Sequence, residues 1–459
     1  MVLFTLLILC SPAGWSTNNL ISIGDVDAIF TSLVDGHASV GIAVGIYRDG
    51  KTEVRGYGRV DRDWAETPDG GTVYEIGSIT KIFTDALLAD MVLKGEVKLT
   101  DPVKVHLPPE GVNVPPFQSH EITLLHLATH TSGLPRLPNH FDPADPQNPY
   151  ADYSAAKLYD FLNHHELRYE PGTHNEYSNL GVGLLGHALS WSAQKPYEDL
   201  VVERICQPLG MQETRITLSP EMQTRRAPPY TSGIYPAHAW DFDALAGAGA
   251  LRSTVNDMLR FIAALLADED DCLPALRFCL EPLAFEAGRA GDQGPLGWIT
   301  TKTSTHSYEM LWHNGGTGGY HAFLGFDREQ QIGLVALSNS DDFLLDHACF
   351  DAMNSLHGYE TTPPVYAMPP EALQGFAGAY RLAGDRGRFV LEYKDGMLIS
   401  TDDQNRNRLL VPLAPQRFHL VGLPEGYGVE FQQAEGRIQS ATLSLGKETI
   451  PLVPETKNF

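Results

Sequence analysis

The sequence predicts an α+β fold followed by a small all-β domain. Strand-like runs lie near both ends of the first 340 residues, and helical patterns fill the chain between them. This order favours one antiparallel sheet flanked by helices over alternating βαβ units. Beyond residue 370 the chain shows only short alternating apolar runs separated by turns, which predict strands. With 459 residues, of which 43% are hydrophobic, the chain is long enough for two or three packed domains.

The first strands of the expected sheet form a hairpin. Two β-rich runs, residues 40–48 and 52–60, are joined at Asp49-Gly50, a turn-forming pair. Three further runs predict strands that complete the sheet: residues 308–313, 320–327 and 332–338. Four segments between these strands have apolar residues at helical spacing and predict helices: residues 79–93, 154–162, 180–189 and 254–266.

Proline content marks the boundary before the second domain. Residues 361–370 carry four prolines, a composition suited to an extended linker. We therefore expect a signal peptide over residues 1–18, a main domain over 19–358, a linker over 359–370 and a small domain over 371–459. Within that last part, five runs predict strands: residues 388–393, 397–400, 417–421, 429–433 and 441–445.

The N-terminal residues predict export. An apolar run from Val2 to Leu9 precedes Cys10 and several small residues, the order of a secretory signal and its cleavage region, although no basic residue comes before the run. The run is much shorter than the roughly 20 residues that span a bilayer, so no integral membrane span is expected. We expect a periplasmic or secreted protein. A lipoprotein anchored at Cys10 and a buried N-terminal strand are the alternatives.

Composition excludes several classes of partner and site. The net charge of −24 opposes binding to nucleic acid. Five cysteines without a C-x-x-C pair indicate neither a disulfide scaffold nor a zinc site, although export would permit a bond between Cys272 and Cys279. His126 and His130 have a helical metal-ligand spacing but lack the glutamate of H-E-x-x-H. We expect no metal and no cofactor, and the sequence carries no signal for an oligomeric state.

The first chemical motif is Ser78-Ile-Thr-Lys81, where a glycine-containing segment gives way to an apolar helix. Residues three apart share one face of a helix, so the Lys81 amine can approach the Ser78 hydroxyl. A desolvated lysine can take the proton of a serine and make it a nucleophile. The alternative is a serine that caps the helix beside a solvent-facing lysine.

The second motif is Tyr177-Ser-Asn179, on a loop that leads into the helix from Leu180. In a functional interpretation Tyr177 relays protons between nucleophile and leaving group, and Asn179 donates to a substrate carbonyl. In the structural alternative Asn179 caps the helix and Tyr177 packs beside it.

The third motif is the glycine-rich run from His313 to Tyr320, which follows a predicted strand. Its glycines permit close backbone approach to a ligand, and an N–H at this strand edge can join that of Ser78 in an oxyanion hole. The alternative is a glycine-rich turn. The three motifs occur 99 and then 136 residues apart, and their combination is far less expected by chance than each motif alone.

With these motifs the chain resembles the serine β-lactamase and penicillin-binding-protein superfamily, particularly its class C-like branch of DD-peptidases, D-aminopeptidases and esterases. The segments 125–135, with His-Thr-Ser-Gly-Leu, and 246–261 are similar to further segments of that branch. The resemblance covers about residues 23–340 and implies the β-lactamase/transpeptidase-like fold, with an all-helical region beside the sheet. The tail from Phe376 is similar to the small β-barrel-like domain often appended in this branch.

The resemblance implies a serine hydrolase that cleaves amide or ester bonds of a small-molecule or peptide substrate through an acyl-serine. It makes Ser78 the nucleophile, Lys81 its partner, and Tyr177 a general base or acid. Asn179, His313, Gly315 and Gly316 are then substrate-binding, with the N–H of Gly316 in the oxyanion hole. His313 stands where β-lactamases carry the lysine of K-T-G, which argues against efficient β-lactam hydrolysis. The alternative function is a penicillin-binding sensor or scaffold with slow or no turnover.

A histidine at position 313, in place of the lysine of K-T-G, also predicts that substrate binding depends on pH. An unperturbed histidine titrates near pH 6.5, so we expect its protonation to govern the binding of an anionic substrate group between about pH 6 and 8.

Overall fold

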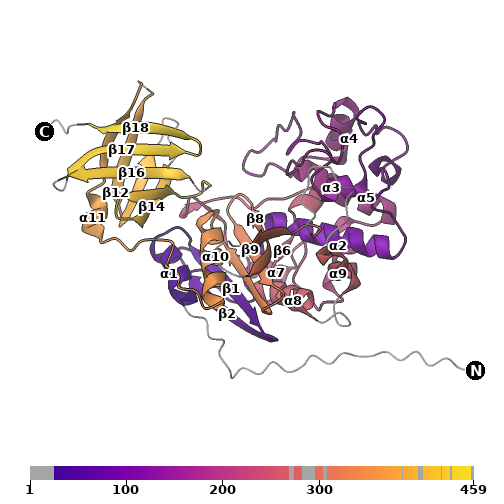
Figure 1. The fold of residues 1–459 in the computed structure, drawn as a ribbon, viewed down its shortest axis with the longest axis horizontal. Coiled ribbons are helices and arrows are strands. Elements are labelled where there is room, and N and C mark those ends of the chain that lie inside the picture. The colour runs from indigo at the N-terminus through magenta and orange to yellow at the C-terminus, as the bar shows by residue number, and fades with distance from the viewer. Residues whose placement is uncertain are drawn as a thin grey trace, which may run out of the picture.

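The computed structural model describes residues 25–267, 273–281, 295–302, 308–384, 386–401, 407–424, 426–434 and 437–455. The expected signal peptide and Cys272 lie outside these ranges. In Figure 1 a central sheet lies between a helical region and a C-terminal barrel. The predicted α+β architecture with a small all-β C-terminal domain is confirmed.

The central sheet is antiparallel and has six strands in the order β2-β1-β10-β9-β8-β7. Its members are β1 (Gly41–Arg48), β2 (Lys51–Gly58), β7 (Ile299–Lys302), β8 (Glu309–Gly316), β9 (His321–Asp327) and β10 (Ile332–Ser338). The hairpin turns at Asp49 and Gly50, which both have positive φ. The five predicted runs therefore join one sheet, and β7 adds an edge strand that the sequence did not predict.

Both faces of this sheet are covered, which explains why its strands read as continuous apolar runs. Successive side chains of a strand alternate between the faces. Ala43 of β1 and Val335 of β10 belong to one large core with the helical region. Val44 and Leu334, their neighbours along the chain, belong to a second core with the helices at the two ends of the domain.

The predicted helices at 79–93, 154–162, 180–189 and 254–266 are present as α2, α4, α5 and α8. Two longer helices that the sequence did not predict, α1 and α10, cover the second face. The described helices are α1 (Val26–Asp35), α2 (Thr80–Leu93), α3 (Leu124–Ala128), α4 (Ala155–His164), α5 (Asn179–Ala193), α6 (Tyr197–Val201), α7 (Pro220–Thr224), α8 (Val255–Leu266), α9 (Pro274–Leu280), α10 (Leu344–Leu356) and α11 (Pro370–Gln374). Among the described residues, none of the helices is both long and apolar enough to cross a bilayer.

The C-terminal domain is a closed barrel of eight strands, in which β11 pairs with β18. The strands are β11 (Gly378–Leu382), β12 (Arg388–Lys394), β13 (Met397–Thr401), β14 (Asn407–Ala414), β15 (Arg417–Leu420), β16 (Tyr427–Ala434), β17 (Arg437–Leu445) and β18 (Glu448–Pro454). Leu410 points into the barrel core, whereas Leu409 and Val411 join the core on the second face of the sheet. The barrel therefore covers apolar surface of the main domain.

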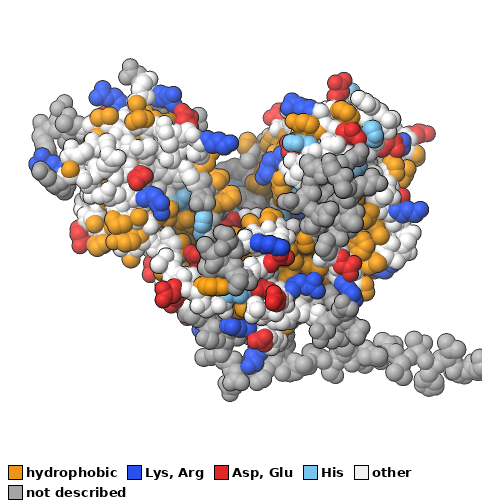
Figure 2. Space-filling model, in the orientation of Figure 1, with side chains coloured by type: hydrophobic (Ala, Val, Ile, Leu, Met, Phe, Trp, Pro, Cys, Tyr) orange, Lys and Arg blue, Asp and Glu red, His pale blue; other side chains and the backbone are white. Residues whose placement is uncertain are grey.

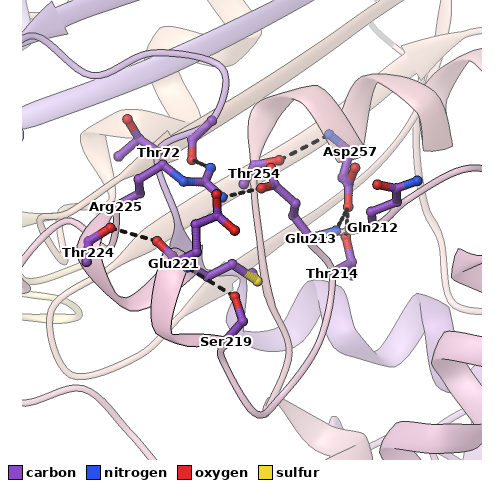
Figure 3. Close-up of polar contacts among 12 residues, drawn as sticks. Thr72, Gln212, Glu213, Thr214, Ser219, Glu221, Thr224, Arg225, Thr254 and Asp257 are labelled. Carbon is purple, nitrogen blue, oxygen red and sulfur yellow. Dashed lines mark hydrogen bonds and ion pairs between the residues drawn. The ribbon is translucent and has the colours of Figure 1, made fainter.

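A polar network fixes the start of α8 beside the sheet (Figure 3). The Thr254 hydroxyl accepts a hydrogen bond from the N–H of Asp257, which caps the helix. The buried Asp257 carboxylate accepts hydrogen bonds from the Glu213 N–H at 2.7 Å and from the Thr214 hydroxyl at 2.9 Å. Arg225 pairs with the Glu213 carboxylate. These contacts anchor the segment 246–257, which also supplies a backbone carbonyl to the candidate site.

Candidate active site

Ser78 lies in a tight turn, η1 (Gly77–Ile79), which runs directly into α2. Lys81 follows one turn later, and its Nζ donates hydrogen bonds to Ser78 Oγ at 2.9 Å and to the carbonyl of Ala248 at 2.7 Å. The lysine side chain is almost completely buried, at 1% exposure. The pair therefore has the geometry that a lysine-activated serine needs, and Lys81 is not the solvent-facing residue of the alternative interpretation.

The environment of Lys81 favours its neutral form. Burial, and then the positive charge of Arg136, hold the pKa of Lys81 well below its usual range, and the nearby Asp85 only partly opposes this. Burial also raises the pKa of the Asp85 carboxyl well above its usual range, which weakens its negative charge. A neutral amine within hydrogen-bond distance of Ser78 can accept the hydroxyl proton.

Tyr177, from the second motif, lies beside Ser78 and Lys81. Its ring centroid lies 4.9 Å from Lys81 Nζ and 6.4 Å from the His313 ring centroid. Burial raises the pKa of Tyr177 to about 12, although a hydrogen bond with Ser78 opposes the shift. Tyr177 is therefore a protonated phenol near neutral pH, and Lys81 is the better placed base of the two.

His130 holds Tyr177 in this position through a contact that the sequence did not predict. The two ring centroids are 4.5 Å apart, and the His130 Nδ1 accepts a hydrogen bond from the N–H of Ser178 at 3.1 Å. The backbone of His130 is left-handed, with φ of 58°, and its carbonyl accepts the N–H of Glu176 at 2.9 Å. His126 and His130 are four residues apart but do not share a helix face, because α3 ends at Ala128.

Asn179 begins α5, but it does not cap that helix. Ser178 is the cap, and its hydroxyl accepts the N–H of Gly181. The Asn179 Nδ2 donates to the Tyr150 hydroxyl at 2.9 Å, while its Oδ1 is buried without a hydrogen-bond partner among the described residues. The buried carbonyl oxygen of Asn179 thus has an unused acceptor position among the described residues.

The third motif approaches the turn of Ser78 backbone to backbone. A Cβ added at Gly315 would lie 2.0 Å from the carbonyl oxygen of Ile76 and 2.8 Å from the nitrogen of Ser78, so no side chain fits there. A Cβ added at Gly77, which has φ of +48°, would lie 2.8 Å from the nitrogen and from the carbonyl oxygen of Gly316. Glycine at both positions therefore lets the end of β8 lie against the turn, and the backbone of Gly316 lies beside that of Gly77, which directly precedes Ser78.

His313 is buried on β8 and is neutral at physiological pH. Its Nδ1 donates to the carbonyl of Asn314 at 2.5 Å, since a carbonyl only accepts. Burial, and then the neighbouring Lys81, lower the pKa of His313 to about 4. The expectation that His313 titrates between about pH 6 and 8 is therefore wrong, because neither burial nor the position of Lys81 is visible in the sequence.

The structure thus brings together six of the seven residues proposed for the site: Ser78, Lys81, Tyr177, His313, Gly315 and Gly316. Asn179 lies two residues after Tyr177, at the start of α5, and its side chain contacts Tyr150. Among the described residues, no group of three or more metal-ligating side chains is arranged to hold a metal ion. The His126 Nδ1 instead accepts the N–H of Thr123 in a capping box at the start of α3. The described side chains alone can supply a nucleophile, a base and hydrogen-bond donors.

Comparisons with known proteins agree with this geometry. The family model described as Beta-lactamase matches residues 26–357. The D-alanyl-D-alanine-carboxypeptidase/endopeptidase AmpH of Escherichia coli K12 is 29% identical over 342 residues, which cover 72% of this chain and 87% of that protein. A β-lactamase of the same organism is 27% identical over 348 residues, covering 69% of this chain and 88% of that protein.

Solved structures extend the likeness to the fold. The β-lactamase/D-alanine carboxypeptidase from Yersinia pestis, complexed with citrate, has a TM-score of 0.61 at 29% identity and covers 72% of this chain and 96% of that one. The octameric penicillin-binding protein homologue from Pyrococcus abyssi has a TM-score of 0.64 at 22% identity, covering 95% of this chain and 99% of that one, so its fold likeness includes the barrel. From the family match over most of its length, the chain belongs to the β-lactamase family of serine hydrolases.

Proposed function

We propose that this chain is a serine peptidase and esterase that cleaves an amide or ester bond next to a D-amino acid through an acyl-serine. The observation that carries the proposal is the hydrogen bond of 2.9 Å between the buried Lys81 amine and Ser78 Oγ. A buried amine with a lowered pKa is a base, and a hydroxyl beside it is a nucleophile.

In the first step Ser78 Oγ bonds to the substrate carbonyl carbon while its proton passes to Lys81. The N–H groups of Ser78 and Gly316 stabilise the negative oxygen of the tetrahedral intermediate. When the C–N or C–O bond breaks, the leaving group takes a proton through Tyr177, which is protonated near neutral pH. The proton on Lys81 then passes to Tyr177. Water attacks the acyl-serine while its proton moves to Lys81, and this proton goes to Ser78 Oγ when the acyl C–O bond breaks and the acid is released.

Two observations favour a peptide or ester over a β-lactam as the preferred substrate. His313 stands in the place of the K-T-G lysine and carries no charge near neutral pH. AmpH, a similar protein over 72% of this chain, is named a D-alanyl-D-alanine-carboxypeptidase/endopeptidase. We also propose that the chain is exported, on the strength of its apolar N-terminal run.

The test uses the full chain and its Ser78→Ala variant. A fluorophosphonate should add to the wild-type protein, with mass spectrometry placing the adduct on Ser78, and the variant should stay unlabelled. Hydrolysis of D-Ala-D-Ala peptides, p-nitrophenyl esters and nitrocefin is then compared, and we expect the first two to exceed nitrocefin in kcat/KM. An adduct that persists in the variant would refute Ser78 as the nucleophile. A labelled enzyme with one acylation event and no turnover would instead favour the sensor function.

A further inference from the structure

The end of strand β8 has a strand partner on one side only. Among the described residues, β7 pairs with β8 up to Trp312, whereas β9 continues the pairing to Gly316. The N–H of Thr317 donates to the Tyr320 carbonyl at 3.0 Å and so points to the side of β9. Because successive N–H groups of a strand point to opposite sides, the N–H of Gly316 points away from β9, toward the turn of Ser78.

Helix α10 holds this strand end through one carboxylate. Asp346 Oδ2 accepts a hydrogen bond from the side-chain amide of Asn314 at 2.6 Å, and Asp346 Oδ1 lies 2.9 Å from His321 Nε2. Asn314 is two residues before Gly316 on β8, and His321 lies directly opposite Gly316 on β9. The two contacts therefore flank the residue whose N–H is proposed for the oxyanion hole.

The imidazole of His321 also lies beside Gly316 itself. A Cβ added at Gly316 would lie 3.7 Å from His321 Nδ1, which is an ordinary van der Waals contact. The His321 ring packs against Phe343 with a centroid distance of 5.0 Å, and only 2% of His321 is exposed. The imidazole thus has a fixed place between the start of α10 and the end of β8.

Helix α10 is a rigid support for these contacts. Asp346 lies in its first turn, where the helix favours a negative charge. Leu345, Ala348 and Met353 of the same helix are completely buried in the core on this face of the sheet. A side chain on a packed helix fixes a neighbouring group more precisely than a side chain on a loop does.

We propose that Asp346 is a positioning residue for the oxyanion hole and that it acts through Asn314 and His321 on the N–H of Gly316. This inference rests on the proposed function and adds a residue on which its rate depends. No bond is made or broken at Asp346, which lies on the α10 face of the sheet. An oxyanion-hole donor stabilises the transition state only when it points at the oxygen, so a small displacement of Gly316 should lower kcat more than it raises KM.

The experiment compares p-nitrophenyl phenylacetate with its thiono analogue, in which sulfur replaces the carbonyl oxygen. Sulfur is a weak hydrogen-bond acceptor, so cleavage of the thiono ester depends little on the oxyanion hole. Asp346→Ala should lower kcat/KM for the oxygen ester by about 10- to 100-fold, mainly through kcat, and for the thiono ester by less than about threefold. A loss of folded protein would lower both rates equally, so the ratio of the two rates reports on the oxyanion hole.

Two further variants make the test specific. The side chain of Asp346→Asn can still accept from Asn314 and can donate to a neutral His321, so this variant should recover most of the lost ratio. Asp351→Ala removes a carboxylate further along α10 that forms neither of the two hydrogen bonds, and it should leave the ratio unchanged. A ratio in Asp346→Asn as low as that in Asp346→Ala would overturn the positioning role.

Fluorophosphonate labelling of Ser78 separates the two hypotheses. If the wild-type protein is not labelled and cleaves neither ester, the proposed function fails and this inference fails with it. If Ser78 is labelled and esters are cleaved, but the wild type does not prefer the oxygen ester or Asp346→Ala keeps the wild-type preference, the role of Asp346 alone is overturned. Loss of the preference in Asp346→Ala, with its recovery in Asp346→Asn, supports that role.

Discussion

Two buried histidines on neighbouring strands face opposite sides of the sheet. His313 of β8 faces the helical region and the candidate site, and His321 of β9 faces α10. Burial, and then Lys81, lower the pKa of His313 to about 4. Burial also acts to lower the pKa of His321, but the charge of Asp346 and its hydrogen bond of 2.9 Å outweigh it, so the net shift is upward.

The difference shows what each face of the sheet does. On the α10 face Asp346 accepts hydrogen bonds from His321 and from Asn314, and so ties β8 and β9 to α10. On the site face His313 has no carboxylate partner and lies near a lysine. On the α10 face, a buried charge has a partner of opposite sign, which stabilises the fold. On the site face, burial disfavours the charged forms of the titratable groups, and groups with such shifted pKa values are suited to proton transfer.

The largest expected effect on stability lies where the barrel meets the α10 face. Val411 is completely buried in the core that includes α1 and α10. Val411→Asp should lower the free energy of unfolding by about 3 kcal/mol or more, because a carboxylate there has no partner. Urea denaturation followed by tryptophan fluorescence measures this.

Val453→Asp is the matched control, since Val453 is 50% exposed on β18. It should change stability by less than about 0.5 kcal/mol. Equal effects of the two substitutions would mean that the barrel does not rest on the main domain in solution.

The two histidines should affect the pH dependence of stability with opposite signs. For His313, the folded pKa of about 4 lies below the unfolded value of 6.5, so stability falls as the pH drops from 6.5 to 4. His313→Asn should remove about 3 kcal/mol of this acid sensitivity, from a difference of about 2.5 pKa units.

For His321, the raised pKa gives stability that is present below pH 6.5 and is lost as the pH rises through the folded pKa. His321→Asn should therefore flatten the stability curve above pH 6.5, where His313→Asn has no effect. Unfolding free energies from pH 4 to pH 9 test both variants. Shifts of the same sign in the two variants would contradict the assignment of opposite environments.

Much of the fold was predictable because its local patterns are strong. The hairpin at Asp49-Gly50 and helices α2, α5 and α8 carry clear turn or helical signals. The sequence did not predict strand β14, because Leu409, Leu410 and Val411 are all buried, against two different cores. The run therefore lacks the alternation of apolar and polar residues that predicts a strand. Helix α10 has apolar residues three and four apart, for example Leu345, Ala348 and Cys349, and that spacing was the signal available to find it.

The site was predictable only where a motif is contiguous in sequence. Ser78 and Lys81 are three residues apart, so helix geometry alone brings them together. His130 contacts Tyr177 although 46 residues separate the two in the sequence, and no local pattern predicts that contact. The pKa of His313 depends on burial and on Lys81, which only the tertiary structure defines.

A smaller effect is expected from His130, which positions Tyr177 on the site face. His130→Ala removes the ring contact and the acceptor for the Ser178 N–H. We expect kcat to fall about 10- to 100-fold with little change in KM, because a small misplacement of a catalytic group costs rate. His130→Asn should recover part of kcat, since asparagine tolerates positive φ and can accept the same hydrogen bond. An equal loss in both variants, or a rise in KM alone, would remove the positioning role.

The smallest effect is expected when His313 is replaced: the dependence of substrate preference on pH should not change. This prediction bears most directly on the contrast between the two faces. A histidine with a pKa of about 4 stays neutral from pH 6 to pH 8, so it cannot make the binding of an anionic substrate depend on pH in that range. For a carboxylate ester and its neutral counterpart, the ratio of kcat/KM values should therefore stay constant from pH 6 to 8 in the wild type and in His313→Asn. A ratio that falls with an apparent pKa near 6.5 in the wild type, and is flat in the variant, would show that His313 carries the charge after all and that the site face binds protons as the α10 face does.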